Sequence, residues 1–293
     1  MVSLKFNSTA DIKVPKHIID QVIGQDEAVK VIKKAAQQKR HVLLIGEPGT
    51  GKSMLGFALA ELLPMEKLVD IIAFPNPNDE NMPLIRTVPA GQGRDLVAKA
   101  KLQSMTMLKN QNIVLFILVL ISVFAPWWAW YYYSKYGHTV AAIMTAASLI
   151  VLILVLIGFT LTLNLSKRIE NRVKIPRVIV DNYKRKQASF NDATGAHAGA
   201  LLGDVLHDPF QSGGLGTPAH DRVVAGMIHK SHLGVLFIDE IATLQPATQQ
   251  ELLSALQERK FAITGQSERS AGAMVRTEPV PCDFVLLAAG NYE

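Results

Sequence analysis

The chain has 293 residues, of which 49% are hydrophobic and 19% are charged, and this length is enough for one large domain or two. The net charge of +5 is mild and no basic stripe with interleaved aromatic residues is visible, so no nucleic-acid partner is expected. The single cysteine, Cys282, excludes an intrachain disulfide bond. The mean hydropathy of +0.20 is high for a soluble protein and indicates membrane segments, while Met1–Pro15 lacks the apolar core of a signal peptide.

The first predicted helix covers Asp26–Gln38, where apolar residues recur on one face and lysines on the other. The four apolar residues Val42–Ile45 then predict a buried strand, and Ala and Leu residues recur in a helical pattern over Met54–Leu63. A strand, a glycine-containing loop and a helix therefore follow one another in the order that a phosphate-binding loop requires.

Residues Gly46–Ser53 match the phosphate-loop pattern G-x-x-x-x-G-K-[ST] at every fixed position. Glycines allow backbone N–H groups to turn toward phosphate oxygens, and the helix N-terminus adds a partial positive charge. Lys52 can neutralise the β- and γ-phosphates of ATP, and the Ser53 hydroxyl can bind Mg²⁺. The alternative is a glycine turn that matches by chance. The predicted ATP-binding residues are Gly46, Glu47, Pro48, Gly49, Thr50, Gly51, Lys52 and Ser53.

Two long uncharged segments interrupt the chain after this motif. No charged residue lies between Lys109 and Lys135, and Ile113–Tyr133 has the length and composition of a bilayer-spanning helix, with Trp and Tyr residues gathered at its far end. A second apolar segment, Val140–Leu165, follows closely. The pair predicts a transmembrane helical hairpin over residues 112–165. The alternative is two buried helices of a soluble core.

Basic residues flank the outer ends of this hairpin, whereas the connection between its helices carries only Lys135 as a full positive charge. By the positive-inside rule, both soluble arms are expected in the cytoplasm, where ATP is available. The basic residues before and after the hairpin are Lys99, Lys101, Lys109, Lys167, Arg168, Arg172 and Lys174.

The segments around the hairpin carry weaker signals. A second strand is predicted at Leu68–Phe74 and a loop at Pro83–Gly93. Beyond the hairpin, Arg177–Asp192 is polar and expected to be partly helical, and Gly195–Gly216 is glycine-rich and expected to be irregular. Further helices are predicted at Ala219–His229 and Pro246–Arg259, and further strands at Phe261–Thr264 and Phe284–Ala288.

Two adjacent carboxylates, Asp239 and Glu240, follow the apolar segment Val235–Ile238. A strand buried on both faces of a parallel sheet is apolar without alternation, and ligands bind at the carboxyl ends of such strands. Asp239 can therefore hold Mg²⁺, and Glu240 can polarise a water molecule that attacks a phosphate. The alternative is a helix cap before Ile241.

The second half of the chain holds other candidates that the sequence leaves open. Phe210 could grip a translocating polypeptide in the pore of a ring, or it could simply pack within its own loop. The histidines of this half match no zinc-binding pattern and are expected to be solvated or to cap helices. They are His197, His207, His220, His229 and His232.

Several of these motifs resemble those of AAA+ ATPases. Val22–Ala28, which precedes the phosphate loop, is similar to their adenine-side motif. This resemblance implies that Ile23 packs on the base, although Ile23 could also belong to the core. Asn291, after the apolar segment Phe284–Ala288, fits the sensor-1 position, which helps orient the attacking water, or it is a turn residue after Gly290.

The combination of features resembles one family, the archaeal membrane-bound Lon proteases. The features are the phosphate loop, the hairpin inserted before the paired carboxylates, the string Asp208–His220 and the segment Gly234–Ile241. The resemblance implies an α/β fold, an AAA+ P-loop NTPase core whose parallel sheet is flanked by helices and interrupted by a two-helix transmembrane hairpin. The expected parts are residues 1–111, the hairpin 112–165 and residues 166–293.

The same resemblance implies ATP and Mg²⁺ as cofactors and a homo-oligomer, a hexameric ring, as the assembly. It implies the lipid bilayer and unfolded or damaged proteins as partners, at the cytoplasmic face of the cell membrane. It also implies that the helical lid and the Ser–Lys protease dyad of the family lie beyond Glu293. Two other functions stay open: an AAA+ remodelling ATPase without protease activity, and a regulatory module that binds nucleotide without hydrolysing it.

Overall fold

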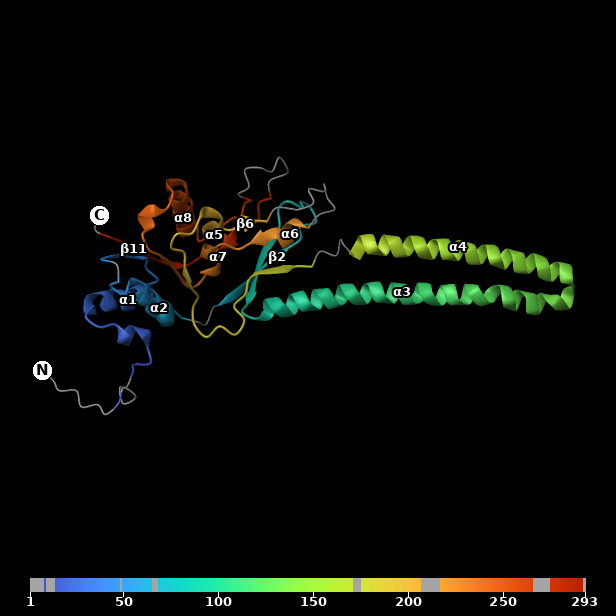
Figure 1. Ribbon diagram of the computed structural model, residues 1–293, viewed down its shortest axis with the longest axis horizontal. Coiled ribbons are helices and arrows are strands. Elements are labelled where there is room, and N and C mark those ends of the chain that lie inside the picture. Colours follow the sequence, from blue (N-terminus) through green and yellow to red (C-terminus); the bar gives the residue numbers. More distant parts are fainter. Residues whose placement is uncertain are drawn as a thin grey trace. The chain divides into compact units, whose positions relative to one another are not determined.

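The structure is a computed structural model that describes residues 8, 14–47, 49–64, 68–170, 175–206, 217–265 and 275–291. The chain divides into two compact units, Met1–Asp95 with Pro176–Glu293 as the first and Leu96–Ile175 as the second. The first unit is a mixture of strands and helices, and the second consists of two long helices (Figure 1). The domain boundaries near residues 111 and 165 stay a prediction.

The central sheet of the first unit is parallel and has the strand order β1-β11-β8-β5. Its strands are β1 (Val42–Ile45), β11 (Val285–Gly290), β8 (Val235–Ile238) and β5 (Phe190–Asp192). All four residues of β8 are buried, as expected for a strand that is covered on both faces. Because the strands are parallel, the phosphate loop after β1 and the polar residues after β8 and β11 lie at the same edge of the sheet.

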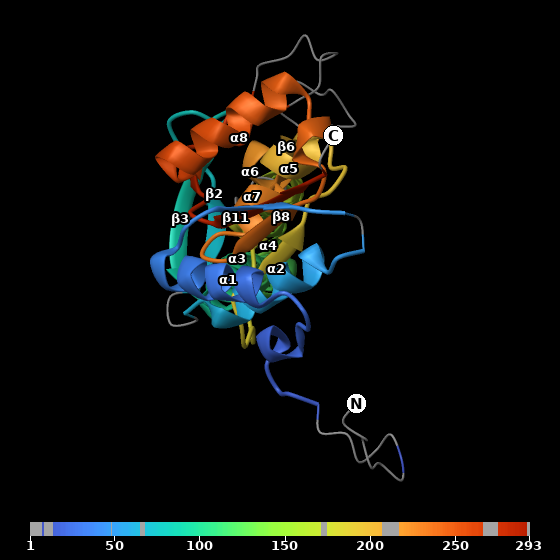
Figure 2. The ribbon, with the colours of Figure 1, turned by 90° about the vertical axis from the view of Figure 1, so that its left-hand side faces the viewer.

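Helices cover both faces of this sheet, and Figure 2 shows β8 and β11 between α1 and α2 on one side and α8 on the other. The first face carries η2 (Ile18–Gln21), α1 (Asp26–Gln38) and α2 (Lys52–Leu62), and the second carries α5 (Ala198–Leu202), α7 (Met227–Lys230) and α8 (Pro246–Glu258). Alternate residues of β8 divide between the two cores, since Phe237 belongs to the first cluster and Leu236 and Ile238 to the second. The sheet is therefore the shared wall of two hydrophobic cores.

A second sheet is antiparallel and has the strand order β3-β2-β4. Its strands are β3 (Leu84–Pro89), β2 (Val69–Phe74) and β4 (Arg177–Val180). The central strand β2 is the most buried of the three, and its residues Ile71, Ile72 and Ala73 are fully buried. The chain leaves this sheet after β3 for the long helices and returns to it as β4.

Asp70 on β2 binds both the segment that follows β3 and the segment that follows β4. Its fully buried carboxylate accepts the backbone N–H groups of Gly91 at 2.7 Å, Gly93 at 3.0 Å and Asn182 at 2.8 Å. Gly91 and Gly93 lie at the beginning of α3, and Asn182 follows β4. Since a buried carboxylate is costly unless donors satisfy it, the three hydrogen bonds fix both segments to β2.

Several predictions of local structure are wrong. The segment Gly195–Gly216, expected to be irregular, contains the helix α5 and a short strand, and the strand β1, expected to be buried, has Leu43 and Ile45 exposed. The predicted loop at Pro83–Gly93 contains the edge strand β3, whose three half-buried and three exposed residues do not show the alternation of a typical strand. The partly helical structure predicted for Arg177–Asp192 is instead the short strands β4 and β5, which offer too few residues for a periodic signal.

Another wrong prediction is the continuous helix at Ala219–His229, which is divided between α6 (Ala219–Arg222) and α7. Between them, β7 (Val223–Val224) pairs with β6 (Asp204–Val205). A Cβ added at Gly226 would collide with the backbone of Leu201 and Gly203. The chain therefore leaves the helical path here in order to approach a distant segment closely. The remaining elements are η4 (Ile241–Thr243), β9 (Lys260–Phe261) and β10 (Val280–Pro281).

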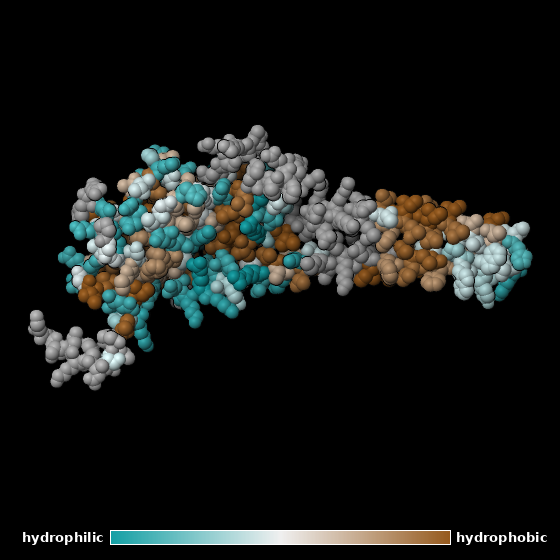
Figure 3. Space-filling model, in the orientation of Figure 1, coloured by the Kyte–Doolittle hydropathy of each residue, from teal (hydrophilic) through white to brown (hydrophobic). Residues whose placement is uncertain are grey.

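The second unit contains most of α3 (Gln92–Tyr133), the turn η3 (Ser134–Tyr136) and α4 (His138–Glu170). Within them, Phe116–Tyr136 and His138–Thr162 are long and apolar enough to cross a membrane. Only 11% and 6% of these two windows are buried, and Figure 3 shows apolar surface over much of this pair. The buried positions described in the pair carry small residues, Ser122, Ala129 and Ala141, which allow apolar helices to approach one another.

Candidate nucleotide-binding site

The phosphate loop connects β1 to α2 and depends on two glycines. Gly49 and Gly51 each have a φ of +82°, a left-handed conformation that glycine adopts without the steric penalty of a Cβ. The Thr50 hydroxyl donates to the carbonyl oxygen of Glu47 at 2.9 Å, which closes the loop internally. Pro48 lies outside the described residues. The local sequence therefore sets the shape of the loop before any ligand is considered.

Lys52, the first residue of α2, is the centre of the site. Its side chain is only 8% exposed, and its Nζ donates to the Gly46 carbonyl oxygen at 3.0 Å and to Asn291 Oδ1 at 3.2 Å. Asp239 Oδ1 lies 3.5 Å from the same nitrogen. An ammonium group has three donors, of which two form these hydrogen bonds, while Asp239 contacts the same nitrogen as an ion pair. The ends of β1, β8 and β11 thus meet around one cationic nitrogen.

The two carboxylates occupy a tight turn between β8 and η4. The Asp239 side chain is 32% exposed, and its Oδ1 also accepts the backbone N–H of Glu240 at 3.0 Å. Glu240 has a φ of +50°, which is uncommon for a residue other than glycine, and its side chain is exposed. The structure therefore directs one carboxylate to Lys52 and leaves the other open to solvent.

The segment Val22–Ala28, which resembles an adenine-side motif, contacts the phosphate loop through a residue that the sequence did not single out. The Gln25 side-chain amide donates to the Thr50 carbonyl oxygen. Ile23 is 92% exposed, so it does not belong to the core, while its neighbour Val22 packs against the core that contains α1 and α2. An exposed apolar side chain on a segment bonded to the phosphate loop suits contact with a base, which stays a prediction.

The donors expected for Mg²⁺ fit the chemistry of that ion. Ser53 is exposed in the first turn of α2, and Asp239 projects from the end of β8. Magnesium is usually held by one or two protein oxygen ligands together with phosphate oxygens and water. Among the described residues no group of three or more His, Cys, Asp or Glu could hold a metal ion.

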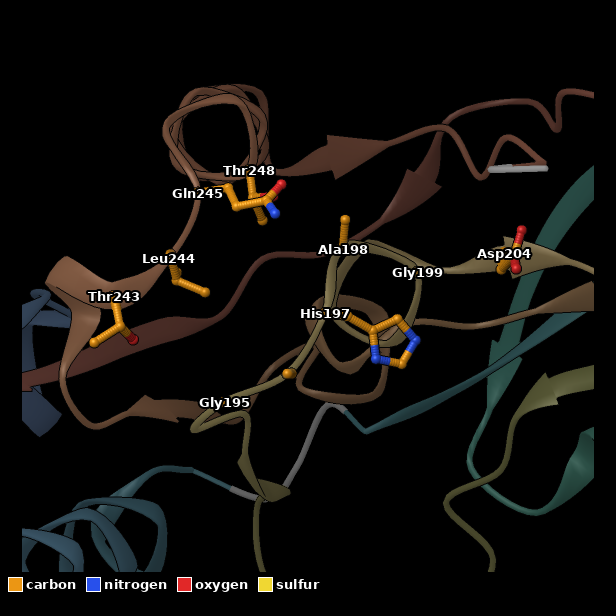
Figure 4. Close-up of a pocket in the computed structure, with 10 residues that line it drawn as sticks. Gly195, His197, Ala198, Gly199, Asp204, Thr243, Leu244, Gln245 and Thr248 are labelled. Carbon is orange, nitrogen blue, oxygen red and sulfur yellow. The ribbon is translucent and has the colours of Figure 1, made fainter. Parts of the chain in front are cut away.

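A cavity of about 430 Å³ includes Thr243, which follows the carboxylate turn by three residues, in its lining (Figure 4). Its walls come from the loop and first turn of α5 and from the segment between η4 and α8. Its lining residues are Gly195, Ala196, His197, Ala198, Gly199, Asp204, Thr243, Leu244, Gln245 and Thr248. None of the predicted nucleotide ligands is among them, so this cavity is separate from the nucleotide site.

The structure brings Gly46, Lys52, Asp239 and Asn291 together, although their roles remain predictions. Phe210 and most of the string Asp208–His220 lie outside the described residues. Sequence reasoning missed the role of Gln25, which lies inside a motif it had recognised, and missed Thr194, whose hydroxyl accepts the backbone N–H of Asp239 at 3.0 Å. No sequence signal marked Thr194, because the two residues are 45 positions apart.

Two family models match parts of the chain. The model of the sigma-54 interaction domain matches residues 175–277, and the model of magnesium chelatase, subunit ChlI, matches residues 18–75. A solved complex between subunits BchI and BchD of magnesium chelatase shares 18% identity and a TM-score of 0.43, covering 96% of this chain and 56% of that one. The parallel sheet, its phosphate loop and the chelatase match define an AAA+ P-loop NTPase core interrupted by two long apolar helices.

Curated relatives narrow the class of protein from AAA+ P-loop NTPases to one family. The archaeal Lon protease of Thermococcus kodakarensis is 57% identical over 297 residues, which cover 100% of this chain and 44% of the relative. That of Archaeoglobus fulgidus is 56% identical over 290 residues, covering 99% and 44%. That of Methanocaldococcus jannaschii is 34% identical over 307 residues, covering 100% and 46%. The chain therefore belongs with the archaeal Lon proteases and spans less than half the length of these relatives.

Proposed function

We propose that this chain is the ATP-hydrolysing AAA+ module of a membrane-anchored, ATP-dependent serine protease of the Lon type. The observation that supports this proposal best is the meeting of Gly46, Asp239 and Asn291 around the Lys52 ammonium. Three strand ends that are far apart in the sequence converge there on the groups that phosphoryl transfer uses, a cation, a metal ligand and a polar amide.

In the proposed reaction each group has one role. Backbone N–H groups of the phosphate loop and Lys52 bind the β- and γ-phosphates, and Ser53 and Asp239 hold Mg²⁺, which neutralises phosphate charge when bound. Glu240 accepts a proton from water as the water attacks the γ-phosphorus, and Asn291 orients that water. The bond to the β,γ-bridging oxygen breaks, and ADP and inorganic phosphate leave.

Substitution of Lys52 tests the nucleotide site. We expect Lys52→Ala to abolish measurable binding of a fluorescent ATP analogue, because the phosphates lose a cation in a largely buried position. The matched control is Lys99→Ala, which removes the same charge from an exposed position on α3 and should bind as the unaltered protein does. Unchanged binding by Lys52→Ala contradicts the assignment of the phosphate loop.

Membrane anchoring is the second part of the proposal. Two long helices free of charge over most of their length, hardly buried and flanked by basic residues, support a hairpin that crosses the bilayer twice with both arms in the cytoplasm. A soluble core would bury such helices, since exposing this much apolar surface to water is unfavourable.

The role of the whole protein follows from its relatives. They are named archaeal Lon proteases, and we infer that the protein unfolds and degrades abnormal or short-lived proteins at the cytoplasmic face of the membrane. The partners proposed with this role are further copies of the chain in a hexameric ring, unfolded or damaged polypeptides, and membrane lipid.

A further inference from the structure

We propose that Thr194 and Thr243 are positioning residues that clamp the Asp239–Glu240 turn from its two ends. The proposal rests on the proposed ATP hydrolysis, because it concerns the geometry of the two carboxylates assigned to that reaction. Neither threonine is among the residues predicted to contact nucleotide or metal.

Thr194 holds the beginning of the turn. Its hydroxyl oxygen lies 3.0 Å from the backbone nitrogen of Asp239 and 2.6 Å from Asp192 Oδ1. A backbone N–H can only donate and an ionised carboxylate can only accept, so the Thr194 proton points to Asp192 and its lone pair to Asp239. The same Asp192 oxygen accepts the Thr194 backbone N–H at 3.0 Å. The hydroxyl is therefore fixed in direction as well as in place.

Thr243 holds the end of the turn. Both its backbone N–H and its hydroxyl donate to the Glu240 carbonyl oxygen, each at 2.8 Å. Glu240 needs this support, because a residue other than glycine with a φ of +50° is strained and persists only where its surroundings determine it. The strained residue thus has a fixed carbonyl, and the residue before it has a fixed amide.

Packing supports the two sides of this turn, where Ile238 and Ile241 contact the core, but Glu240 itself depends on hydrogen bonds. Glu240, Thr194 and Asp192 are all exposed, and the cavity in Figure 4 opens beside the turn, with Thr243 and Gly195 in its lining. Loss of one hydroxyl therefore removes a restraint from a turn whose Glu240 is exposed to solvent. Because Asp239 Oδ1 lies 3.5 Å from Lys52, such a movement would displace both carboxylates from the phosphate-binding groups.

The consequence should appear in turnover and not in nucleotide binding measured without Mg²⁺. A displacement of about 1 Å in a catalytic group can reduce a rate on the order of 100-fold, whereas the phosphate loop and Lys52 remain in place to bind nucleotide. In the full-length protein in detergent, we expect Thr194→Val to lower kcat for ATP roughly 10- to 100-fold. Binding of a fluorescent ATP analogue without Mg²⁺, which depends on the phosphate loop and Lys52, should stay unchanged. Thr194→Ser, which keeps the hydroxyl, should restore most of the rate.

Two further variants complete the experiment. Thr243→Val keeps its backbone donor to Glu240, so its kcat should fall less, by roughly three- to tenfold, as expected for loss of one of two hydrogen bonds. Thr160→Val makes the same chemical change on α4, where the hydroxyl only donates to Ile157, and should have the parent kcat.

The outcomes separate this inference from the proposed function. A parent rate in Thr194→Val, together with active unaltered protein, overturns the clamp and leaves ATP hydrolysis intact. A Thr194→Ser variant as slow as Thr194→Val also overturns it, because the effect would not depend on the hydroxyl. Lack of turnover by the unaltered full-length protein contradicts the proposed function, and the clamp falls with it.

Discussion

His229 shows how burial changes the chemistry of a single side chain. It is completely buried on α7, and its Nε2 lies 3.1 Å from the Phe261 carbonyl oxygen, which can only accept a hydrogen bond. Nε2 must therefore carry the proton, while Nδ1 has no hydrogen-bond partner within the described structure. Burial lowers the pKa of this imidazole from 6.5 to about 4, with the Phe261 hydrogen bond opposing the shift and His232 adding to it.

The lowered pKa of His229 predicts loss of stability in acid. Between pH 6.5 and about 4 the unfolded chain binds a proton that the folded chain does not, so the free energy of unfolding falls as the pH falls through this window. The loss from this group reaches about 3 kcal/mol below the window and is absent above pH 6.5. Urea unfolding of the protein at pH 7 and pH 5 measures it.

The control for this measurement is His229→Gln, whose side-chain amide can still donate to Phe261 but does not titrate. We expect the variant to lose less stability than the unaltered protein between pH 7 and pH 5. Equal losses in both proteins would show that His229 is not the responsible group.

Cys282 illustrates the same principle for a thiol. It is 1% exposed, and burial raises its pKa to about 12, with Asp283 and Glu258 adding to the shift. Since the thiolate is the reactive form, this cysteine belongs to the core and is inert in the folded protein. The role of Cys282 is therefore to pack in the core.

Among the helices and strands, the sequence identifies those with long or strongly patterned segments. The helix predicted at Asp26–Gln38 matches α1, the strand predicted at Val235–Ile238 matches β8, and the helix predicted at Pro246–Arg259 differs from α8 by one residue. The periodicity or the continuous apolar character of these segments is enough to predict their secondary structure.

The sequence does not reveal features that depend on distant partners. Asp70 lies inside an apolar strand and gives no sign that it will bind Gly91, Gly93 and Asn182, the last of which is 112 residues away. Thr194 and Asp239 meet only because β5 and β8 are neighbours in the sheet. The phosphate loop could be predicted because its ligands are consecutive, whereas the clamp and the helix attachment are products of topology.

The hairpin helices carry a prediction about membrane association. If α3 and α4 cross the bilayer, the intact protein should remain in the membrane pellet after carbonate washing, because burying these apolar surfaces in lipid outweighs their exposure to water. Deletion of residues 112–165 should release the protein into the supernatant, and immunoblotting of the two fractions measures the distribution.

A matched control for the deletion is Gly158→Ala, which changes one hairpin residue at a position where an added Cβ meets nothing within 4 Å. It should stay in the pellet. Intact protein that is soluble in detergent-free buffer would contradict membrane anchoring, whatever the deletion does.

The order of the central sheet unites these features in one site. Because β1, β11 and β8 are neighbours and parallel, Lys52, Asn291 and Asp239 converge although the first two are 239 residues apart. The long helices are inserted between β3 and β4 of the other sheet, so they interrupt no strand of the central sheet. This arrangement explains how an AAA+ core can accommodate a large insertion and keep its nucleotide site.

The adjacent carboxylates provide the sharpest test of ATP hydrolysis at this site. Asp239 is assigned to Mg²⁺, so Asp239→Ala should weaken Mg·ATP binding as well as the rate. Glu240 is assigned to the attacking water, so Glu240→Gln should bind ATP nearly as the unaltered protein does. Its hydrolysis should be slower by roughly 10²–10⁴-fold, the usual contribution of a positioned general base.

The measurement is steady-state ATP hydrolysis beside equilibrium ATP binding, for both variants in the full-length protein. We expect weak binding with little hydrolysis for Asp239→Ala, and near-parent binding with little hydrolysis for Glu240→Gln. Hydrolysis by Glu240→Gln at the parent rate would contradict the account, because Glu240 would then be no more than a strained residue at the start of η4.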